Sequence, residues 1–462
     1  MEIYHIFLIL INIFFVNSND IISIPFYKDF PNLNGLSPEE IFTKIKENTL
    51  LSEIYLGTPS QKILLKLALT DYIFYIGGKS SHFHNKFIET DSQTYKKVSD
   101  NTIYFMISNV REGFFASDYF YLNVNPNDKK EINFVLGTDT DKSNEGGLIG
   151  LNIQDIDTKK YERYNFINIL KSKRYIKDYY FTIKYNTDDN SNSGNLIIGD
   201  LPHNYNNSYN VKYFKDMYIS MFTDVLTWNI NLDSIYIADN ANSENKKIVG
   251  ERVYGYFKIE QGIITGTERY REYLLNYFMT ENIDKKLCFE VKSAFYVSYY
   301  CKKEVDLTKF KSLFIYIKEL DYTFELNYKD LFYNNNDGNN YFLVYFNNEY
   351  NEEEYSSFYW VLGEPFLKKY NLIFNQETNR IGLYTDMNFG GNNNDEDNLE
   401  NKSFWSRNKW YIILIIILVI VCAGLGIMIF LYKKVIPKRR KKANELDDEF
   451  DYSSKDRYII NY

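Results

Sequence analysis

The chain has 462 residues, a formal net charge of −8 and 45% hydrophobic residues. A chain of this kind can bury a large core and form more than one lobe. Its acidic balance and the lack of a phosphate-binding loop argue against a nucleic-acid or nucleotide partner. Its few cysteines and histidines form no metal-ligand pattern, so we expect no metal and no cofactor.

The first 18 residues have the features of a secretory signal peptide. An apolar run over 6–16 is of signal length and too short to span a bilayer. Ser18 offers a small residue for cleavage. The segment 19–50 that follows is predicted to be a short N-terminal extension.

Strand patterns dominate the next 330 residues or so, which predicts an all-β fold. Helical patterns occupy 161–173 and 268–279. The predicted strands are 63–67, 72–76, 102–107, 114–122, 179–185, 196–198, 212–213, 313–317 and 341–346.

Three motifs occur in order along this region: 54–61 (IYLGTPSQ), 147–151 (GLIGL) and 360–370 (WVLGEPFLKKY). Together they resemble the pepsin-like aspartic proteases over residues 51–385. The resemblance implies an all-β, bilobal pepsin-like fold with an interlobe cleft, divided into an N-terminal lobe (51–205) and a C-terminal lobe (206–385). Against this family, the segment 19–50 is shorter and less basic than an inhibitory prosegment.

The first catalytic aspartate of the family is replaced. In the family an Asp-Thr-Gly triplet follows the first motif by seven positions, and this count reaches Ala68, Leu69 and Thr70. A methyl group can neither carry nor share a proton. Asp71 lies three residues further on, about 10 Å along an extended chain, so we interpret it as a turn residue. It is also the fallback candidate for a carboxylate.

The second aspartate is replaced as well. Placing Gly262 on the family glycine puts Glu260 at the aspartate position and Gln261 at the following threonine. The loop is divergent, and a shift of one or two residues is an open alternative. On this alignment Ala68 and Glu260 should face each other across the base of the cleft. The flap tyrosine of the family is replaced too, with Met106 at its position.

The losses are selective, because backbone-shaping residues remain while chemical groups are gone. The hydrophobic-hydrophobic-glycine triplets that end at Gly150 and Gly363 both survive. Aspartic proteolysis needs two carboxylates that share one proton. The sequence therefore predicts a folded member of the family without an intact catalytic dyad.

The cysteines and sequons fit an oxidising, glycosylating compartment. Family members carry a local disulfide where Cys288 and Cys301 lie, so we expect these two to pair. Asn206 and Asn401 begin Asn-x-Ser sequons and are candidate glycosylation sites.

A second apolar run, 411–432, is long enough to span a bilayer. A basic cluster follows within 433–442 and predicts a cytoplasmic C-terminal tail, 433–462. Residues 386–410 form a polar stalk. The chain is thus expected to be a single-pass type I protein of the secretory pathway or cell surface.

The functional expectation is a membrane-anchored, pepsin-fold pseudoenzyme that binds a peptide or protein partner in its interlobe cleft. One alternative is an aspartic-type endopeptidase with a divergent site that uses Glu260 and another carboxylate. A second alternative is a sorting or adhesion receptor.

The topology can be tested by protease protection in sealed vesicles. Residues 19–409 should be shielded in the lumen, while an antibody epitope within 433–462 should be lost on digestion. Detergent should expose both parts equally. Digestion of the large domain with protection of the tail would contradict the proposed orientation.

Overall fold

The computed structural model describes residues 21–29, 32–104, 110–121, 129–153, 164–186, 193–220, 227–294, 296–347 and 359–386. The chain divides into two units, Met1–Gly390 and Gly391–Tyr462, and every described residue lies in the first. The predicted signal peptide, membrane span and cytoplasmic tail fall outside the described residues. Within the described ranges, no helix is both long and apolar enough to cross a membrane.

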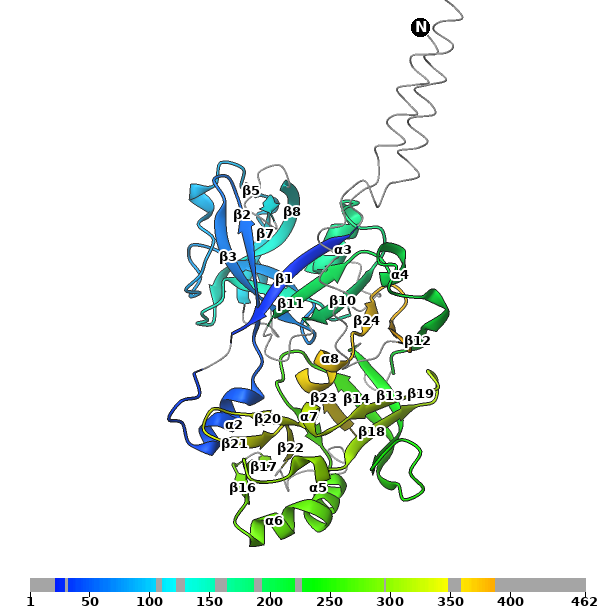
Figure 1. The fold of residues 1–462 in the computed structure, drawn as a ribbon. Helices are drawn as coiled ribbons and strands as arrows, with labels where there is room; N and C mark the ends of the chain where they lie inside the picture. The colour runs from blue at the N-terminus through cyan, green and yellow to red at the C-terminus, as the bar shows by residue number, and fades with distance from the viewer. Residues whose placement is uncertain are drawn as a thin grey trace, which may run out of the picture. The chain divides into compact units, whose positions relative to one another are not determined.

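Two β-sheets contain most of the described residues (Figure 1). The N-terminal sheet has 14 strands, in the order β12-β25-β24-β10-β11-β1-β2-β3-β9-β4-β8-β7-β5, with β6 beside β7. Its strands are β1 (Ile22–Lys28), β2 (Leu50–Leu56), β3 (Gln61–Ala68), β4 (Phe74–Gly77), β5 (Lys96–Lys97), β6 (Ile103–Tyr104), β7 (Val110–Tyr121), β8 (Lys129–Thr140), β9 (Gly147–Gly150), β10 (Tyr180–Tyr185), β11 (Ser193–Ile198), β12 (Phe214–Tyr218), β24 (Ile373–Asn375) and β25 (Arg380–Tyr384).

The C-terminal sheet has 11 strands, in the order β19-β18-β13-β14-β23-β15-β22-β17-β21-β20, with β16 beside β17. Its strands are β13 (Asn229–Ala238), β14 (Lys247–Phe257), β15 (Ile264–Gly266), β16 (Cys288–Lys292), β17 (Tyr296–Lys302), β18 (Ser312–Ile317), β19 (Tyr322–Leu326), β20 (Phe332–Asn334), β21 (Asn339–Phe342), β22 (Val344–Asn347) and β23 (Tyr359–Leu362). The N-terminal sheet thus includes three strands from beyond residue 206, so its pairing crosses the lobe boundary expected from sequence.

The described helices are short: α2 (Pro38–Lys46), α3 (Phe166–Ser172), α4 (Pro202–Tyr205), α5 (Glu268–Leu274), α6 (Thr280–Asp284), α7 (Tyr328–Leu331) and α8 (Glu364–Lys369). A π-helical turn over Leu275–Met279 joins α5 to α6, so the helix predicted over 268–279 is confirmed. The strand predicted over 212–213 is wrong. Asn210 accepts a hydrogen bond from the Lys212 amide and holds a short 3₁₀ turn there, and the strand begins at Phe214.

Residues 32–49 leave the N-terminal sheet and return to the same point, and we call them the α2 excursion. The Asp29 amide donates to the Thr49 carbonyl at 3.0 Å, which joins the two ends. Ser37 and Glu40 form a capping box around Pro38, so the sequence itself specifies where α2 begins. Sequence reasoning missed this helix, although the capping signature was readable.

The apolar face of α2 packs on the C-terminal sheet. Phe42 lies edge-on to Tyr341 with ring centroids 5.3 Å apart, and the Lys46 ammonium lies 5.3 Å from the Tyr296 ring centre. The buried cluster comprises Leu33, Ile41, Phe42, Ile45, Ile263, Val291, Tyr296, Tyr341 and Tyr345. The excursion is therefore fixed to the C-terminal sheet by apolar burial.

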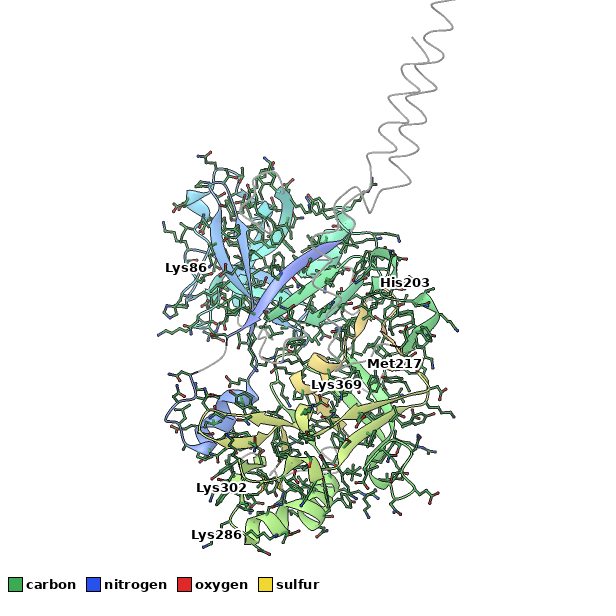
Figure 2. All side chains as sticks on the ribbon, in the orientation of Figure 1. Lys86, His203, Met217, Lys286, Lys302 and Lys369 are labelled. Atoms are coloured by element: carbon green, nitrogen blue, oxygen red, sulfur yellow. A yellow bond between two sulfur atoms is a disulfide. The ribbon has the colours of Figure 1, made fainter. Side chains whose placement is uncertain are left out.

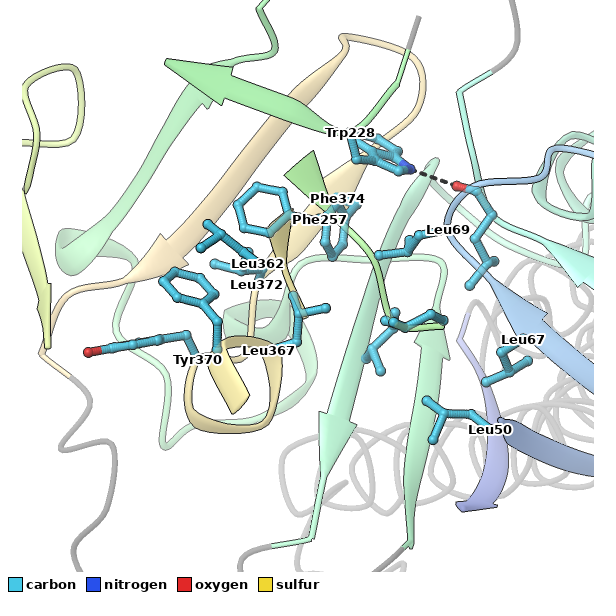
Figure 3. Close-up of a cluster of buried hydrophobic side chains, with 14 of the residues drawn as sticks. Leu50, Leu67, Leu69, Trp228, Phe257, Leu362, Leu367, Tyr370, Leu372 and Phe374 are labelled. Atoms are coloured by element: carbon cyan, nitrogen blue, oxygen red, sulfur yellow. Dashed lines mark hydrogen bonds between the residues drawn. The ribbon is translucent and has the colours of Figure 1, made fainter. Parts of the chain in front are cut away.

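A single apolar cluster connects the two sheets (Figure 3). Leu69 from the N-terminal side and Phe257 from the C-terminal side belong to it, and both are buried. Trp228 is buried there too and donates from Nε1 to the Leu151 carbonyl at 2.8 Å. Exposed lysines such as Lys286 and Lys302 lie at the periphery instead (Figure 2).

The predicted disulfide is confirmed. Cys288 and Cys301 lie directly opposite each other on β16 and β17 and are bonded. A bonded pair of this kind fits an oxidising compartment.

Removing this disulfide should lower the free energy of unfolding by about 3 kcal/mol, the value expected for a short loop. The double variant Cys288→Ala/Cys301→Ala should therefore unfold at a lower urea concentration than the oxidised wild type. Wild type under reducing conditions is the control and should shift in the same direction. Identical unfolding midpoints for oxidised and reduced protein would contradict the expectation.

Candidate functional site

The candidate site is built from two loops that occupy matching places in the two sheets. The N-terminal half-site loop (68–73) leaves β3, which pairs in parallel with β9. The C-terminal half-site loop (258–263) leaves β14, which pairs in parallel with β23. In each case the next strand, β4 or β15, pairs antiparallel with the same partner. The two loops can therefore be compared residue by residue.

The strand register assigns the equivalent positions. Ala68 lies opposite Gly150 in the first ladder. The second ladder ends with Phe257 opposite Leu362, which places Lys258 beside Gly363. The Lys258 amide indeed donates to the Leu362 carbonyl at 3.2 Å.

The antiparallel strand pairs give the same assignment. Tyr75, seven residues after Ala68, lies opposite Leu148, and Thr265, seven residues after Lys258, lies opposite Val361. Lys258 therefore corresponds to Ala68, and Glu260 corresponds to Thr70. The aspartate position predicted from sequence is therefore corrected from Glu260 to Lys258. This change of two residues lies within the shift of one or two residues that the sequence alignment left open.

Close backbone contacts hold both loops against their glycines. A Cβ atom on Gly150 would lie 2.5 Å from the Ile73 nitrogen. One on Gly363 would lie 2.2 Å from the Ile263 carbonyl oxygen. Neither contact leaves room for a side chain, so these glycines define the shape of the loops.

Thr70 and Glu260 meet between the two loops. The Thr70 amide and hydroxyl both donate to Glu260 Oε1, at 2.9 and 2.6 Å. Ala68 is only 2% exposed and packs in an apolar cluster with Tyr75 and Phe115. The expectation that Ala68 faces Glu260 is thus corrected, because Thr70 makes that contact.

Asp71 takes the turn role that the sequence predicts. Its Oδ1 accepts from the Ile73 amide at 2.9 Å, and its carbonyl accepts from the Asn152 amide at 2.9 Å. Burial raises the pKa of the Asp71 carboxyl to about 6, and the charge of Glu260 adds to this effect. The amides of Ile73 and Tyr72 oppose the rise in pKa by hydrogen bonding.

The end of the α2 excursion pairs with the C-terminal half-site loop. The Asn48 amide donates to the Glu260 carbonyl at 2.9 Å, and the Gly262 amide donates to the Lys46 carbonyl at 2.8 Å. A Cβ atom on Gly262 would lie 2.0 Å from the Ile45 carbonyl oxygen. The backbone groups of Glu260 and Gly262 are therefore bonded to the chain itself, a feature that sequence reasoning missed.

A buried ion pair lies close to the same region. Lys28 Nζ lies 2.5 Å from Glu364 Oε2, and their side chains are 9% and 13% exposed. Glu364 directly follows Gly363, so this pair ties β1 to the start of α8. Such a pair is costly to break once both charges are buried.

The remaining predicted site residues lie elsewhere. Met106 and Asn401 fall outside the described residues. The Asn206 side-chain oxygen accepts from the amide and hydroxyl of Ser208, at 2.9 and 2.8 Å. Among the described residues, no group of three or more His, Cys, Asp or Glu side chains could hold a metal ion.

Comparison with known families adds one finding. The family model described as eukaryotic aspartyl protease matches residues 50–385. No curated protein shows significant similarity to the chain. The match covers both half-site loops and both glycine triplets.

The raised pKa of Asp71 predicts a pH-dependent stability. Since its pKa in the folded state lies above the ordinary value of 3.8, folding favours the protonated form. The stabilising contribution of the Asp71 carboxyl to the free energy of unfolding is fully present below about pH 4 and is lost as the pH rises through 6. The loss should be on the order of 2–3 kcal/mol.

Asp71→Asn should therefore flatten the decline in unfolding free energy between about pH 4 and 7, as measured by urea titrations. The control is Asp306→Asn. Asp306 makes the same kind of turn, accepting from the Thr308 amide at 3.1 Å, but it is fully exposed. An equal flattening by both variants would argue against a special role for Asp71.

Proposed function

Because the chain belongs to the eukaryotic aspartyl protease family, we propose that it is a pepsin-fold pseudoenzyme that has lost proteolytic chemistry. The observation that carries this proposal is the strand register, which makes Ala68 and Lys258 equivalent. Proteolysis in this family requires two carboxylates about 3 Å apart that share one proton. A methyl group and an ammonium group cannot form such a pair.

The residues beside these two positions support the proposal. In the family, threonines next to the aspartates brace the dyad. Here the equivalent residues are Leu69 and Ile259, which are 1% and 0% exposed and belong to the central apolar cluster. They can make no hydrogen bond with their side chains, so the bracing network is replaced by apolar packing.

A divergent endopeptidase is the second candidate, and one observation favours it. Asp71 and Glu260 are close enough for the charge of Glu260 to raise the pKa of Asp71. Carboxyls with perturbed pKa values occur often at catalytic sites. However, Asp71 Oδ1 is bonded to the Ile73 amide and Glu260 Oε1 to Thr70, so both groups have structural partners.

The proposed role is recognition of a peptide or protein partner by a membrane-anchored protein. A ligand strand that ran along Glu260 and Gly262 would compete with residues 46–48 for the same backbone groups. We therefore place the partner mainly on the N-terminal half-site loop, where Thr70 is exposed. A sorting or adhesion receptor would share this arrangement and differ in what its tail recruits.

The full-length protein should show no acid proteolysis that a statine-type inhibitor blocks. Ala68→Asp alone should stay inactive, because Lys258 still lacks the second carboxylate. Ala68→Asp/Lys258→Asp supplies both carboxylates, yet Leu69 and Ile259 cannot brace them, so at most trace cleavage is expected. Peptide cleavage at acidic pH is the measurement, with an active protease of the family as the assay control.

The proposal would be wrong if the unmodified protein cleaved the peptide and if Glu260→Gln or Asp71→Asn abolished this cleavage. That result would establish the second candidate. Cleavage that survives both substitutions would instead come from a contaminating protease.

A further inference from the structure

Three exposed hydrophobic side chains lie within the short segment 211–218. Val211, Tyr213 and Tyr218 are 61%, 37% and 59% exposed, and we call them the β12 patch. Val211 and Tyr213 belong to the 3₁₀ turn that leads into β12, and Tyr218 ends that strand. A single exposed hydrophobic residue needs no explanation, whereas a group of them often marks a surface that another molecule covers.

The folding of the sheet does not account for the exposed ring of Tyr218. β12 is the last strand of the N-terminal sheet and has a strand neighbour, β25, on one side only (Figure 1). Met217 is 2% exposed and belongs to the central apolar cluster, so β12 is fixed to the core by this residue. Because successive side chains of a strand point to opposite faces, Tyr218 faces away from that core.

Each tyrosine of the patch has a cation over its ring. Lys212 Nζ lies 5.4 Å from the ring centre of Tyr213, and the guanidinium carbon of Arg380 lies 4.1 Å from that of Tyr218. Asp216 pairs with Arg380 at 3.2 Å, so the guanidinium adds little net charge to the surface. Tyrosine rings beside long basic side chains are typical of the boundary between a bilayer and water, where each places its apolar part in the lipid and its polar end in water.

The chain leaves the described domain beside this patch. The Thr385 amide and hydroxyl both donate to the Tyr213 carbonyl, at 3.0 and 3.2 Å. The described residues end at Asp386, and the apolar run that is predicted to span a bilayer begins at Tyr411. The connection between these two residues reaches at most about 85 Å. Because this tether starts at the patch, it raises the local concentration of the bilayer for this surface above all.

We propose that the β12 patch binds the interfacial region of the phospholipid bilayer in which the chain is anchored. This contact rests on the membrane anchor of the proposed function and adds which face of the domain meets the lipid. The rings of Tyr213 and Tyr218 enter the interface, and their hydroxyl groups stay hydrated. Contact at one strand limits the rotation of the domain about its tether. A second copy of the chain is the alternative occupant of the patch.

An environment-sensitive fluorophore on a single cysteine tests the contact in the full-length chain. Cys422→Ser removes the cysteine that lies outside the disulfide, and Val211→Cys then places the label in the patch. In phosphatidylcholine vesicles the emission should shift to the blue, and lipids that carry a nitroxide near the headgroup should quench most of it. Both effects are expected because the label lies among the lipid headgroups.

Val98→Cys in the same Cys422→Ser background is the matched control. Val98 is 56% exposed and directly follows β5, at the opposite end of the strand order from β12. A label there should keep the emission it has in water and should lose little intensity to the nitroxide lipids. Equal quenching at the two positions would overturn the proposal. A blue shift at Val211→Cys without quenching would overturn it too, because a second copy of the chain would then cover the patch.

Removing the tyrosines tests which side chains make the contact. Tyr213→Ser/Tyr218→Ser, added to Val211→Cys, should abolish the quenching, and quenching that survives would contradict the assignment. Alkaline extraction of the same vesicles separates the anchor from the patch. Protein that stays in the membrane without quenching at Val211→Cys would overturn the patch alone and leave the proposed function standing. Release of the protein would overturn the anchor and the patch together.

Discussion

The close contact between each half-site loop and a glycine on the neighbouring strand is the constraint on which the site depends. At Gly150 and Gly363 the loop backbone lies where a Cβ atom would be. This contact fixes the path of each loop whatever side chains the loop carries. Two equivalent loops therefore face each other, although their matched positions carry Ala68 and Lys258.

Within that fixed backbone, Leu69 and Ile259 place buried apolar side chains where the family has polar threonines. Fully burying a side chain such as Leu69 or Ile259 contributes about 1.5–3 kcal/mol, whereas a neutral hydrogen bond contributes about 1 kcal/mol. A pair of close carboxylates is unfavourable unless the two share a proton. In place of a dyad, Glu260 accepts two hydrogen bonds from Thr70, and bonds to a charged group contribute about 1.5–3 kcal/mol each. The burial of Leu69 and Ile259 and the two bonds from Thr70 to Glu260 therefore all act to hold the two sheets together.

How much of this site the sequence predicts depends on what determines each position. The glycine triplets and Ala68 were predictable because their motifs are contiguous. The placement of Glu260 failed because Gly262 resembles the family glycine, while the register is set by pairing with Leu362, far along the chain. The contact made by Asn48 could not be predicted at all, because its amide bonds to the Glu260 carbonyl across the fold and no local pattern records that proximity.

The α2 excursion bears on whether the site serves turnover or recognition. A protease must admit a substrate strand along both half-site loops and then release the products. Here the Glu260 and Gly262 backbone is paired with residues 46–48 of the same chain, and α2 anchors that segment through Phe42 and Ile45. A ligand must compete with a tethered segment, whose effective concentration is on the order of millimolar or higher. Repeated exchange of substrates along this loop is therefore disfavoured. A partner that binds beside Thr70 need not displace the segment, and this asymmetry between the two half-sites favours recognition over cleavage.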